Sequence, residues 1–352
     1  MPERASVPTV LRPGMRFFSL LSALALACGS SASKPAAPAE PPPAAAPVAE
    51  AEPAKPAAEP AEPALPPIPE APPPAPPGAP RPHVVKALAY MPADTQVVIG
   101  VDVPRVAGTP LGDKLRESLL GAKLPAPCET LTAAQFGNVV IGTNGSGKVV
   151  VVLDGKLAER AAIACVEAGV KAKGAKAQSK MVAGRRVHYV TGSTDDNGWL
   201  TWTKTGILLA SSEAALVEAL DPKAAKLGGD LAALAMQTDH GRMLWAAGLV
   251  SPASLAALGA PSGTVTAPLA LRAGVDIAAD TDVDLVLGGS TPAGAAAMAD
   301  GLRALLAPMR SSPTTAPLLA GLRLGVHGSD VHVTARLDAA ITRSLINAVN
   351  VK

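Results

Sequence analysis

Seven residues in the middle of the chain have the spacing of a phosphate-binding loop. The segment GTNGSGK, from Gly142 to Lys148, fits the pattern GxxxxGK, in which backbone amides and a lysine hold the phosphates of a nucleotide. That chemistry also needs a Ser or Thr after the lysine to hold magnesium, and a following helix whose first amides face the phosphates. Here Val149 follows the lysine, and the segment VVVVLDG is typical of a strand. Two strands joined by the residues NGSG indicate a hairpin. We therefore expect no nucleotide to bind.

A second segment carries carboxylates at the spacing of a calcium loop. Asp280, Asp282 and Asp284 match the first positions of such a loop. The sixth position, normally Gly, is Leu285, and the twelfth, normally Glu, is Thr291. We therefore interpret the segment as a turn between strands whose carboxylates point outward, and we predict no metal there.

Two histidines flank a short turn near the carboxyl end of the chain. If Ser329 and Asp330 form the turn, His327 and His332 face each other directly, close enough to share a metal. If Gly328 and Ser329 form the turn, His327 faces Asp330 instead, and a glycine at the first turn position favours this register. We expect both histidines to face solvent from their strands.

Other sites of chemistry are not apparent in the sequence. The chain contains no GxSxG elbow, HExxH helix or CxxC pair, and His188 and His240 stand alone. The basic run KAKGAKAQSKMVAGRR, residues 171–186, suits contact with anionic lipid or cell wall, but a solvated loop and strand edge explains it better. No catalytic, cofactor-binding or metal residues are predicted.

The amino terminus has the features of an export signal. Arg4, Arg12 and Arg16 precede an apolar run, FFSLLSALALA, over residues 17–27. At about 1.5 Å per residue this run spans about 16 Å, whereas the hydrocarbon core of a bilayer is roughly 30 Å thick. A basic segment, a short apolar segment and then small residues predict a signal peptide over residues 1–27.

The end of this run resembles the lipobox of bacterial lipoproteins, in the residues Ala25-Leu26-Ala27-Cys28. The resemblance implies that Cys28 is lipidated on its sulfur and becomes the new amino terminus, so that lipid attaches the protein to a membrane. The family usually carries Leu where this chain has Ala25, and ordinary cleavage nearby with Cys28 incidental is the alternative. In that family an Asp after the cysteine often retains the protein in the inner membrane. Gly29 therefore implies the outer membrane, facing the periplasm or the surface.

Two cysteines remain for the folded part of the chain, Cys128 and Cys165. An even pair in an oxidising compartment favours a disulfide. Cys128 precedes the first predicted hairpin and Cys165 lies on the predicted helix after it, so a helix that packs back on its hairpin would bring them together. Two separate reduced thiols are the alternative.

A Pro-rich segment separates the signal from the folded part. Residues 31–82 hold 20 of the 36 prolines, mixed with Ala and Glu. Proline lacks the amide donor and disfavours helix, so the segment should be extended and unpacked. We interpret residues 28–82 as a lipidated cysteine followed by a disordered tether. A spacer that lifts a domain away from the membrane is favoured over a Pro-rich ligand for a partner domain.

From His83 onward, strand and helix patterns alternate. Strands are expected at residues 96–103, 139–143, 148–153, 186–191, 199–204, 207–211, 243–250, 270–278, 283–288, 322–327 and 331–337. Helices are expected from a cap at Thr109 to residue 120, and at 157–167 with an end at Gly169, 213–220, 292–306 and 339–349. The order predicts an α+β fold of two consecutive antiparallel-sheet-plus-helix units, 83–222 and 223–352.

Composition narrows the class of function. The net charge is +2, from 31 Lys and Arg against 29 Asp and Glu, and aromatic residues make up 2% of the chain. A nucleic-acid partner is not expected, because it needs a clustered basic surface or stacking aromatics. We expect a non-enzymatic, lipid-anchored protein of the cell envelope that presents an α+β binding or scaffold domain to a protein or cell-wall partner, without cofactor or nucleotide. The alternative is an exported hydrolase whose site is not visible in the sequence.

Overall fold

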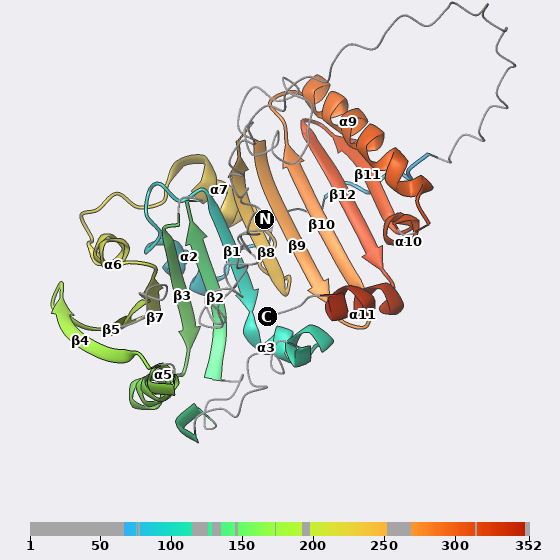
Figure 1. Ribbon diagram of the computed structural model, residues 1–352. Helices are drawn as coiled ribbons and strands as arrows, with labels where there is room; N and C mark the ends of the chain where they lie inside the picture. Colours follow the sequence, from blue (N-terminus) through green and yellow to red (C-terminus); the bar gives the residue numbers. More distant parts are fainter. Residues whose placement is uncertain are drawn as a thin grey trace, which may run out of the picture.

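The computed structural model describes residues 67–348, except 75, 77, 115–125, 129–134, 145–146, 173, 192–197, 252–268 and 314. Within these residues the chain has helices packed on one large antiparallel sheet, which confirms the predicted α+β class (Figure 1). No helix of this part of the chain is both long and apolar enough to cross a membrane.

Apart from β4, which was not predicted, the strands lie close to their predicted positions. They are β1 (Val97–Asp102), β2 (Phe136–Thr143), β3 (Val149–Gly155), β4 (Lys176–Val182), β5 (Arg185–Thr191), β6 (Trp199–Thr203), β7 (Gly206–Ala210), β8 (Leu244–Val250), β9 (Leu269–Ile277), β10 (Thr281–Gly288), β11 (Leu322–His327) and β12 (Asp330–Leu337).

The described helices are α2 (Pro82–Leu88), α3 (Val103–Ala107), η2 (Ala126–Cys128), α5 (Glu159–Ala172), α6 (Glu213–Leu220), α7 (Gly229–Gln237), α9 (Pro292–Ser311), α10 (Ala316–Leu319) and α11 (Ala339–Ala348). Residues 110–114 are also helical, and Thr109 caps them as predicted, because its Oγ1 accepts the amide of Gly112 at 3.1 Å. The predicted continuation of this helix to residue 120 lies outside the described residues.

All twelve strands form one sheet in the order β11-β12-β10-β9-β8-β1-β2-β3-β7-β6-β5-β4 (Figure 1). The first strand set, β1–β7, and the second strand set, β8–β12, meet where β1 pairs antiparallel with β8, with Val97 opposite Gly248 and Val101 opposite Leu244. The two predicted groups of strands therefore share one continuous sheet.

The two strand sets follow a similar path, although four strands follow the crossover helix in the first set and two in the second. In each, three strands pair in sequence order, a helix crosses over, and the chain returns so that its last strand pairs with the third. The crossover helices are α5 and α9, and the returning pairs are β3 with β7 and β10 with β12. A further helix, α6 or α11, follows each set. Strands β1 and β8, which begin the two sets, run antiparallel to each other where the sets meet.

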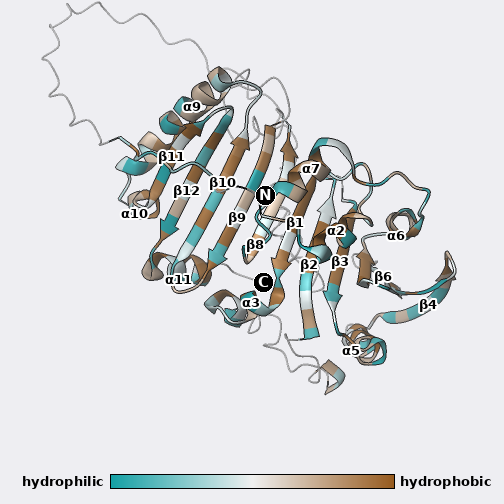
Figure 2. Ribbon diagram, turned by 180° about the vertical axis from the view of Figure 1, so that it is seen from behind, coloured by the Kyte–Doolittle hydropathy of each residue, from teal (hydrophilic) through white to brown (hydrophobic). Residues whose placement is uncertain are grey.

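Helices cover the two faces of the sheet at different places. On one face, called here the α7 face, α2, α6 and α7 bury the main core, in which Val84, Leu216 and Ala235 are 0% exposed (Figure 2). On the opposite face, called here the α9 face, α9 buries Ala295 and Ala299 against Leu324 and Val331. Aromatic side chains contribute little to either cluster, and small aliphatic residues fill most of the volume.

The contact between the strand sets depends on a glycine. The indole of Trp245 on β8 lies across Gly100 on β1, and a Cβ at Gly100 would stand 2.0 Å from the indole Cε2 and Nε1 atoms. Trp245 is itself only 4% exposed and belongs to the main core. The absence of a side chain at Gly100 is therefore what allows this large aromatic group to seal the contact.

Some elements differ from the sequence-based expectations. Helix α5 continues through Gly169 to Ala172, and the residue that ends it is Gly174, whose φ of +74° is the left-handed conformation typical of a helix end. The sequence patterns also missed α2, α7 and the edge strand β4. In β4 almost every side chain is exposed, so no apolar alternation marks it.

Candidate functional site

A row of alternating charges crosses the second strand set on the α7 face. We call Arg105, Asp276, Arg242, Asp284 and His332 the charge ladder. Arg105 Nη2 lies 2.7 Å from Asp276 Oδ1, and Arg242 Nη1 lies 3.0 Å from Asp276 Oδ2. Arg242 Nη2 is 3.9 Å from Asp284 Oδ2, and His332 Nε2 is 3.1 Å from the same oxygen. The ladder therefore links α3, β9, β10 and β12.

Strand register and one glycine bring these side chains together. Asp284 on β10 lies opposite Gly274 on β9, and Gly274 lies opposite Trp245 on β8. A Cβ at Gly274 would be 2.7 Å from Cγ of Arg242. The bare glycine thus leaves the channel through which the Arg242 side chain reaches both Asp276 and Asp284.

Asp276 is the best-supported charge of the ladder. Burial opposes its ionisation, but the amide of Met243 donates to it at 2.9 Å and the guanidiniums of Arg242 and Arg105 add favourable charge, so its pKa lies below the ordinary value. A lowered folded-state pKa means that this carboxylate stabilises the fold above the unfolded pKa of about 3.9 and loses that contribution as the pH falls through its folded pKa.

The ladder ends on the Pro-rich segment. His332 Nδ1 donates to the carbonyl of Pro72 at 2.5 Å, and His327 Nε2 donates to the carbonyl of Ala71 at 3.1 Å. The amide of Leu324, on the edge strand β11, donates to the carbonyl of Pro69 at 3.0 Å. We call residues 69–72, with these contacts, the tether junction.

The tether junction is tightly packed. Ala71 is 2% exposed, and a Cβ at Gly325 would lie 2.7 Å from its carbonyl oxygen. The sequence placed residues 69–72 in an unpacked tether, whereas the structure seats them on β11 and β12. The physical reason is that extended, Pro-rich backbone still has free carbonyls, which can accept bonds from a strand amide and from two histidines.

The histidine pair has the register that a turn at Gly328 and Ser329 predicts. His327 is paired with Asp330, and Gly328 has a φ of +61°. The two histidine rings lie with their centroids 6.2 Å apart. The expectation that both face solvent is wrong for His332, which is 1% exposed and has acceptors at both ring nitrogens.

Replacing His332 with alanine should loosen the tether junction. The change removes the ring contacts to the Pro72 carbonyl and to Asp284, and a buried acceptor left without a partner costs about 1–3 kcal/mol. We expect the free energy of unfolding in urea to fall by about 2 kcal/mol, and the Leu324 amide to exchange with solvent faster.

A matched control is Asp300→Asn, which breaks the exposed pair between Asp300 and Arg303 at 2.8 Å. It should change stability by no more than about 0.5 kcal/mol. An unchanged exchange rate at Leu324 in the His332 variant would show that the histidine does not hold the junction.

The phosphate-loop match lies in the β2–β3 hairpin. The Lys148 amide donates to Asn144 Oδ1 at 3.2 Å, and β3 begins at Val149. Lys148 Nζ lies 2.8 Å from Asp94 and 3.0 Å from Glu218. Hydrogen bonds that the ammonium donates to these carboxylates raise the pKa of Lys148, and the lysine ties the hairpin to α6. Residues 145–146 of the motif lie outside the described part of the chain.

The acidic triplet is divided among separate contacts. Asp280 Oδ2 accepts from Arg336 at 2.9 Å, and Asp284 belongs to the charge ladder. Asp282 on β10 lies opposite Arg336 on β12. Among the described residues, no group of three or more His, Cys, Asp or Glu side chains could hold a metal ion.

His240 lies between α7 and β8, and His188 lies on β5. His240 contacts the Ala235 carbonyl through Nε2 at 2.8 Å, and its Nδ1 accepts the Arg81 amide at 3.4 Å. Burial lowers the pKa of both histidines. His188 Nε2 and the indole nitrogen of Trp202 are buried without a hydrogen-bond partner in the described structure.

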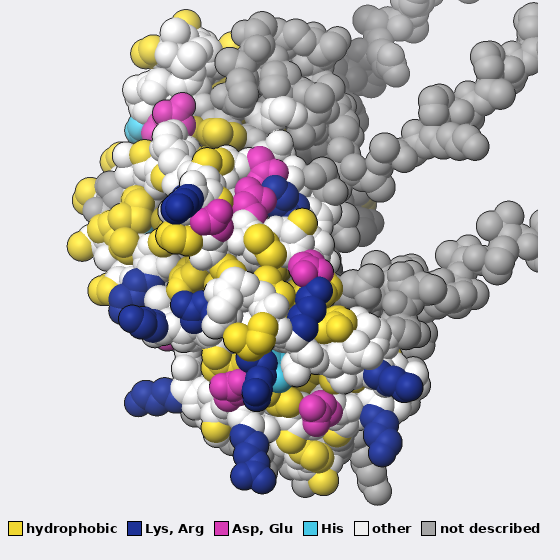
Figure 3. Space-filling model, turned by 90° about the vertical axis from the view of Figure 1, so that its left-hand side faces the viewer, with side chains coloured by type: hydrophobic (Ala, Val, Ile, Leu, Met, Phe, Trp, Pro, Cys, Tyr) yellow, Lys and Arg dark blue, Asp and Glu magenta, His cyan; other side chains and the backbone are white. Residues whose placement is uncertain are grey.

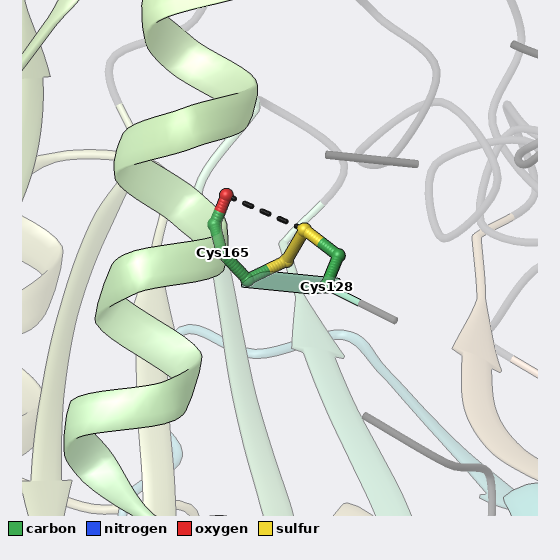
Figure 4. The surroundings of a disulfide bond; sticks show 2 residues. All are labelled: Cys128 and Cys165. Atoms are coloured by element: carbon green, nitrogen blue, oxygen red, sulfur yellow. Dashed lines mark hydrogen bonds between the residues drawn. A yellow bond between two sulfur atoms is a disulfide. The ribbon is translucent and has the colours of Figure 1, made fainter. Parts of the chain in front are cut away.

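Cys128 and Cys165 are joined by a disulfide (Figure 4). Cys128 ends η2 and Cys165 lies on α5, and their Cα atoms are 4.7 Å apart. This distance falls within the range of about 4.4–6.8 Å that a disulfide allows. The bond attaches α5 to the segment that precedes the β2–β3 hairpin. Cys28 lies outside the described residues.

The basic run forms the end of α5 and the β4–β5 hairpin. Strand β4 is the edge of the sheet, and Lys180 on it pairs with Glu213 at 2.7 Å while lying over the stacked rings of Tyr189 and Trp199. Figure 3 shows Lys and Arg side chains spread over this side of the molecule with Asp and Glu between them. Lysines on an edge strand discourage pairing with other chains.

The charge ladder and the tether junction were not foreseen from the sequence. The sequence did contain two signs of these sites. Charged residues such as Arg272 and Asp276 lie on the same face of β9, and glycines occur within the strands. Comparison of the chain with protein-family models, with curated proteins and with solved structures finds no match.

Proposed function

We propose that this chain is a non-enzymatic, lipid-anchored protein of the cell envelope, attached to the outer membrane through Cys28. Its sheet domain would act as a binding or scaffold domain for a protein or cell-wall partner. The observation that carries the proposal is the tether junction, because the chain that leaves the anchor is seated on the sheet by three hydrogen bonds to its carbonyls.

Seating the end of the tether gives the anchor a mechanical purpose. A domain on a wholly free linker samples all orientations, whereas one whose last linker residues are held keeps a defined face toward the end of its tether. A disulfide between Cys128 and Cys165 suits an oxidising compartment outside the cytoplasm. Both features support a domain that is displayed at a distance from a membrane.

The Cys28→Ser variant tests the anchor. We expect it to lose acylation and to move from the membrane fraction to the soluble fraction, because serine offers no thiol for the lipid. Fractionation with metabolic labelling by a fatty acid measures both effects. An unchanged membrane fraction in this variant would contradict the proposal.

A second substitution separates anchoring from sorting. Gly29→Asp keeps the acceptor cysteine and, by the rule of the lipoprotein family, should leave the protein acylated but move it to the inner membrane. Recovery of this variant in the outer membrane would contradict the proposed sorting while leaving the lipid anchor intact.

A further inference from the structure

A hollow on the α7 face of the first strand set brings several polar side chains together. Its volume is about 320 Å³, within the roughly 300–1,000 Å³ typical of small-molecule sites. Helix α2 forms one wall, the β6–β7 turn forms the other, and β2 and β3 form the floor. The polar lining consists of His83, Lys86, Asn138, Asp154, Lys204 and Thr205.

Local irregularities shape the floor. The pairing of β2 with β3 shifts between Phe136 and Val139, as in a β-bulge, and bulges commonly redirect side chains beside binding sites. At this end a Cβ on Gly137 would lie 2.5 Å from the Asp154 carbonyl, and one on Gly206 would lie 2.1 Å from the Leu153 carbonyl. The strands therefore approach closely here and carry the polar residues at the rim.

Hydrogen bonds brace the turn that carries Lys204. Thr203 Oγ1 donates to the Gly206 carbonyl at 3.0 Å and accepts the Thr205 amide at 3.2 Å. Gly206 has a φ of +136°, which only glycine adopts readily. These contacts hold the turn in one conformation and place Lys204 at the mouth of the hollow.

Lys86 and Lys204 are the two lysines that line the hollow. Among the described residues, no carboxylate lies within 4.0 Å of the ammonium group of Lys86 or of Lys204. Lys148, by contrast, is engaged by Asp94 and Glu218. The two lysines outnumber Asp154, the single carboxylate of the lining, so the concave site favours a negatively charged ligand.

We propose that this hollow binds a small organic anion, a carboxylate or a phosphate monoester with a short apolar part. The anionic group lies between Lys86 and Lys204, with the amide of Asn138 and the hydroxyl of Thr205 as donors. The apolar part rests on Val140 and Val152, which are 2% and 3% exposed at the floor. This inference is independent of lipid anchoring.

Protonation of His83 should add to the attraction. Burial lowers the pKa of this histidine, with Arg81 and His240 acting in the same direction and the carboxylates of Asp154 and Asp102 opposing it. The ring is therefore neutral at pH 7 and gains a charge as the pH falls below its folded-state pKa. Anion binding should tighten as the pH is lowered through this region.

The test uses the detergent-solubilised full chain and four probes that share one carbon skeleton: butanoate, butyl phosphate, butanol and butylammonium. Calorimetry should detect binding of the two anions and none of the alcohol or the ammonium. In the unmodified protein, bound butyl phosphate should also protect Lys86 and Lys204 from acetylation, as measured by mass spectrometry.

Matched lysine variants locate the site. Lys86→Gln and Lys204→Gln should each weaken anion binding about tenfold, because each removes a charge-assisted contact, and Lys86→Arg should retain it. Lys223→Gln, at an exposed lysine outside the hollow, should bind like the unmodified chain. The inference would be overturned if butanol bound as tightly as the two anions. It would also be overturned if anion binding and lysine protection were the same in the Lys86 and Lys204 variants as in the unmodified chain. None of these results affects the fractionation of Cys28→Ser.

Discussion

Gly100→Ala should destabilise this protein strongly although it adds only one methyl group. The new Cβ would stand 2.0 Å from two atoms of the Trp245 indole, which is 4% exposed and cannot swing into solvent. Either the indole leaves its place in the core or β1 and β8 move apart. We expect the free energy of unfolding to fall by about 3 kcal/mol or more, and the melting temperature by roughly 6–12 °C.

The control is the same substitution at a glycine with open space. Gly301 lies within α9, is exposed, and has no atom within 4 Å of the position a Cβ would take. Gly301→Ala should stabilise the protein by up to about 1 kcal/mol, because alanine favours the helix. Two Gly→Ala changes would thus have opposite signs. A melting temperature of Gly100→Ala equal to that of the unmodified protein would contradict the described packing of β1 against β8.

Removal of the disulfide should have a comparable effect. Cys128 and Cys165 are separated by 37 residues, and closing a loop of this length lowers the entropy of the unfolded chain by an amount worth about 4 kcal/mol. We expect Cys128→Ala/Cys165→Ala to unfold at a clearly lower denaturant concentration, with a loss of about 2–4 kcal/mol. Adding a reductant to the unmodified protein should reproduce this shift.

Cys28→Ser provides the matching control, because it removes a cysteine and leaves Cys128 and Cys165 in place. Its unfolding midpoint should equal that of the unmodified protein and should still respond to reductant. Two titratable thiols in the unreduced, unfolded Cys28→Ser chain would show that the bond does not form.

Local sequence patterns predicted the individual elements well. Helix α6 has the predicted bounds, because Ser212 accepts the Ala215 amide at its start and an apolar stripe marks its length. The β11–β12 hairpin follows from apolar alternation with a glycine in its turn. The information for such elements lies within a few residues, so a single sequence suffices to find them.

The assembly of those elements could not be predicted in the same way. Pairing of β1 with β8 joins residues about 150 positions apart, such as Val97 and Gly248. The sequence of neither strand indicates which other strand it pairs with. Helix α2 was missed because Pro82 and the Pro-rich segment before it disguise its start, although proline at a first helical position is favourable. Strand β4 was missed because both its faces are exposed.

The candidate sites depend on this long-range assembly. The charge ladder requires the register of β8, β9, β10 and β12 together, and the anion hollow requires α2 beside a turn more than 100 residues later. The disulfide was easier to predict than these sites, because only one pairing of cysteines remained once Cys28 was assigned to lipid. The sequence could therefore predict a covalent contact but not the polar contacts that surround the tether.

The seating of residues 69–72 determines how the protein would respond to force. A pull along the tether reaches the bond between Pro69 and Leu324 before it reaches the carbonyls of Ala71 and Pro72, and all of these before α2. Hydrogen bonds that are loaded one after another at a sheet edge break one at a time. This needs less force than shearing whole strands past each other, because in shearing all the bonds must break together. Under load the junction would yield first and lengthen the tether while the twelve-stranded sheet stays intact. We therefore expect the junction to act as a built-in extension that protects the sheet when the tether is pulled.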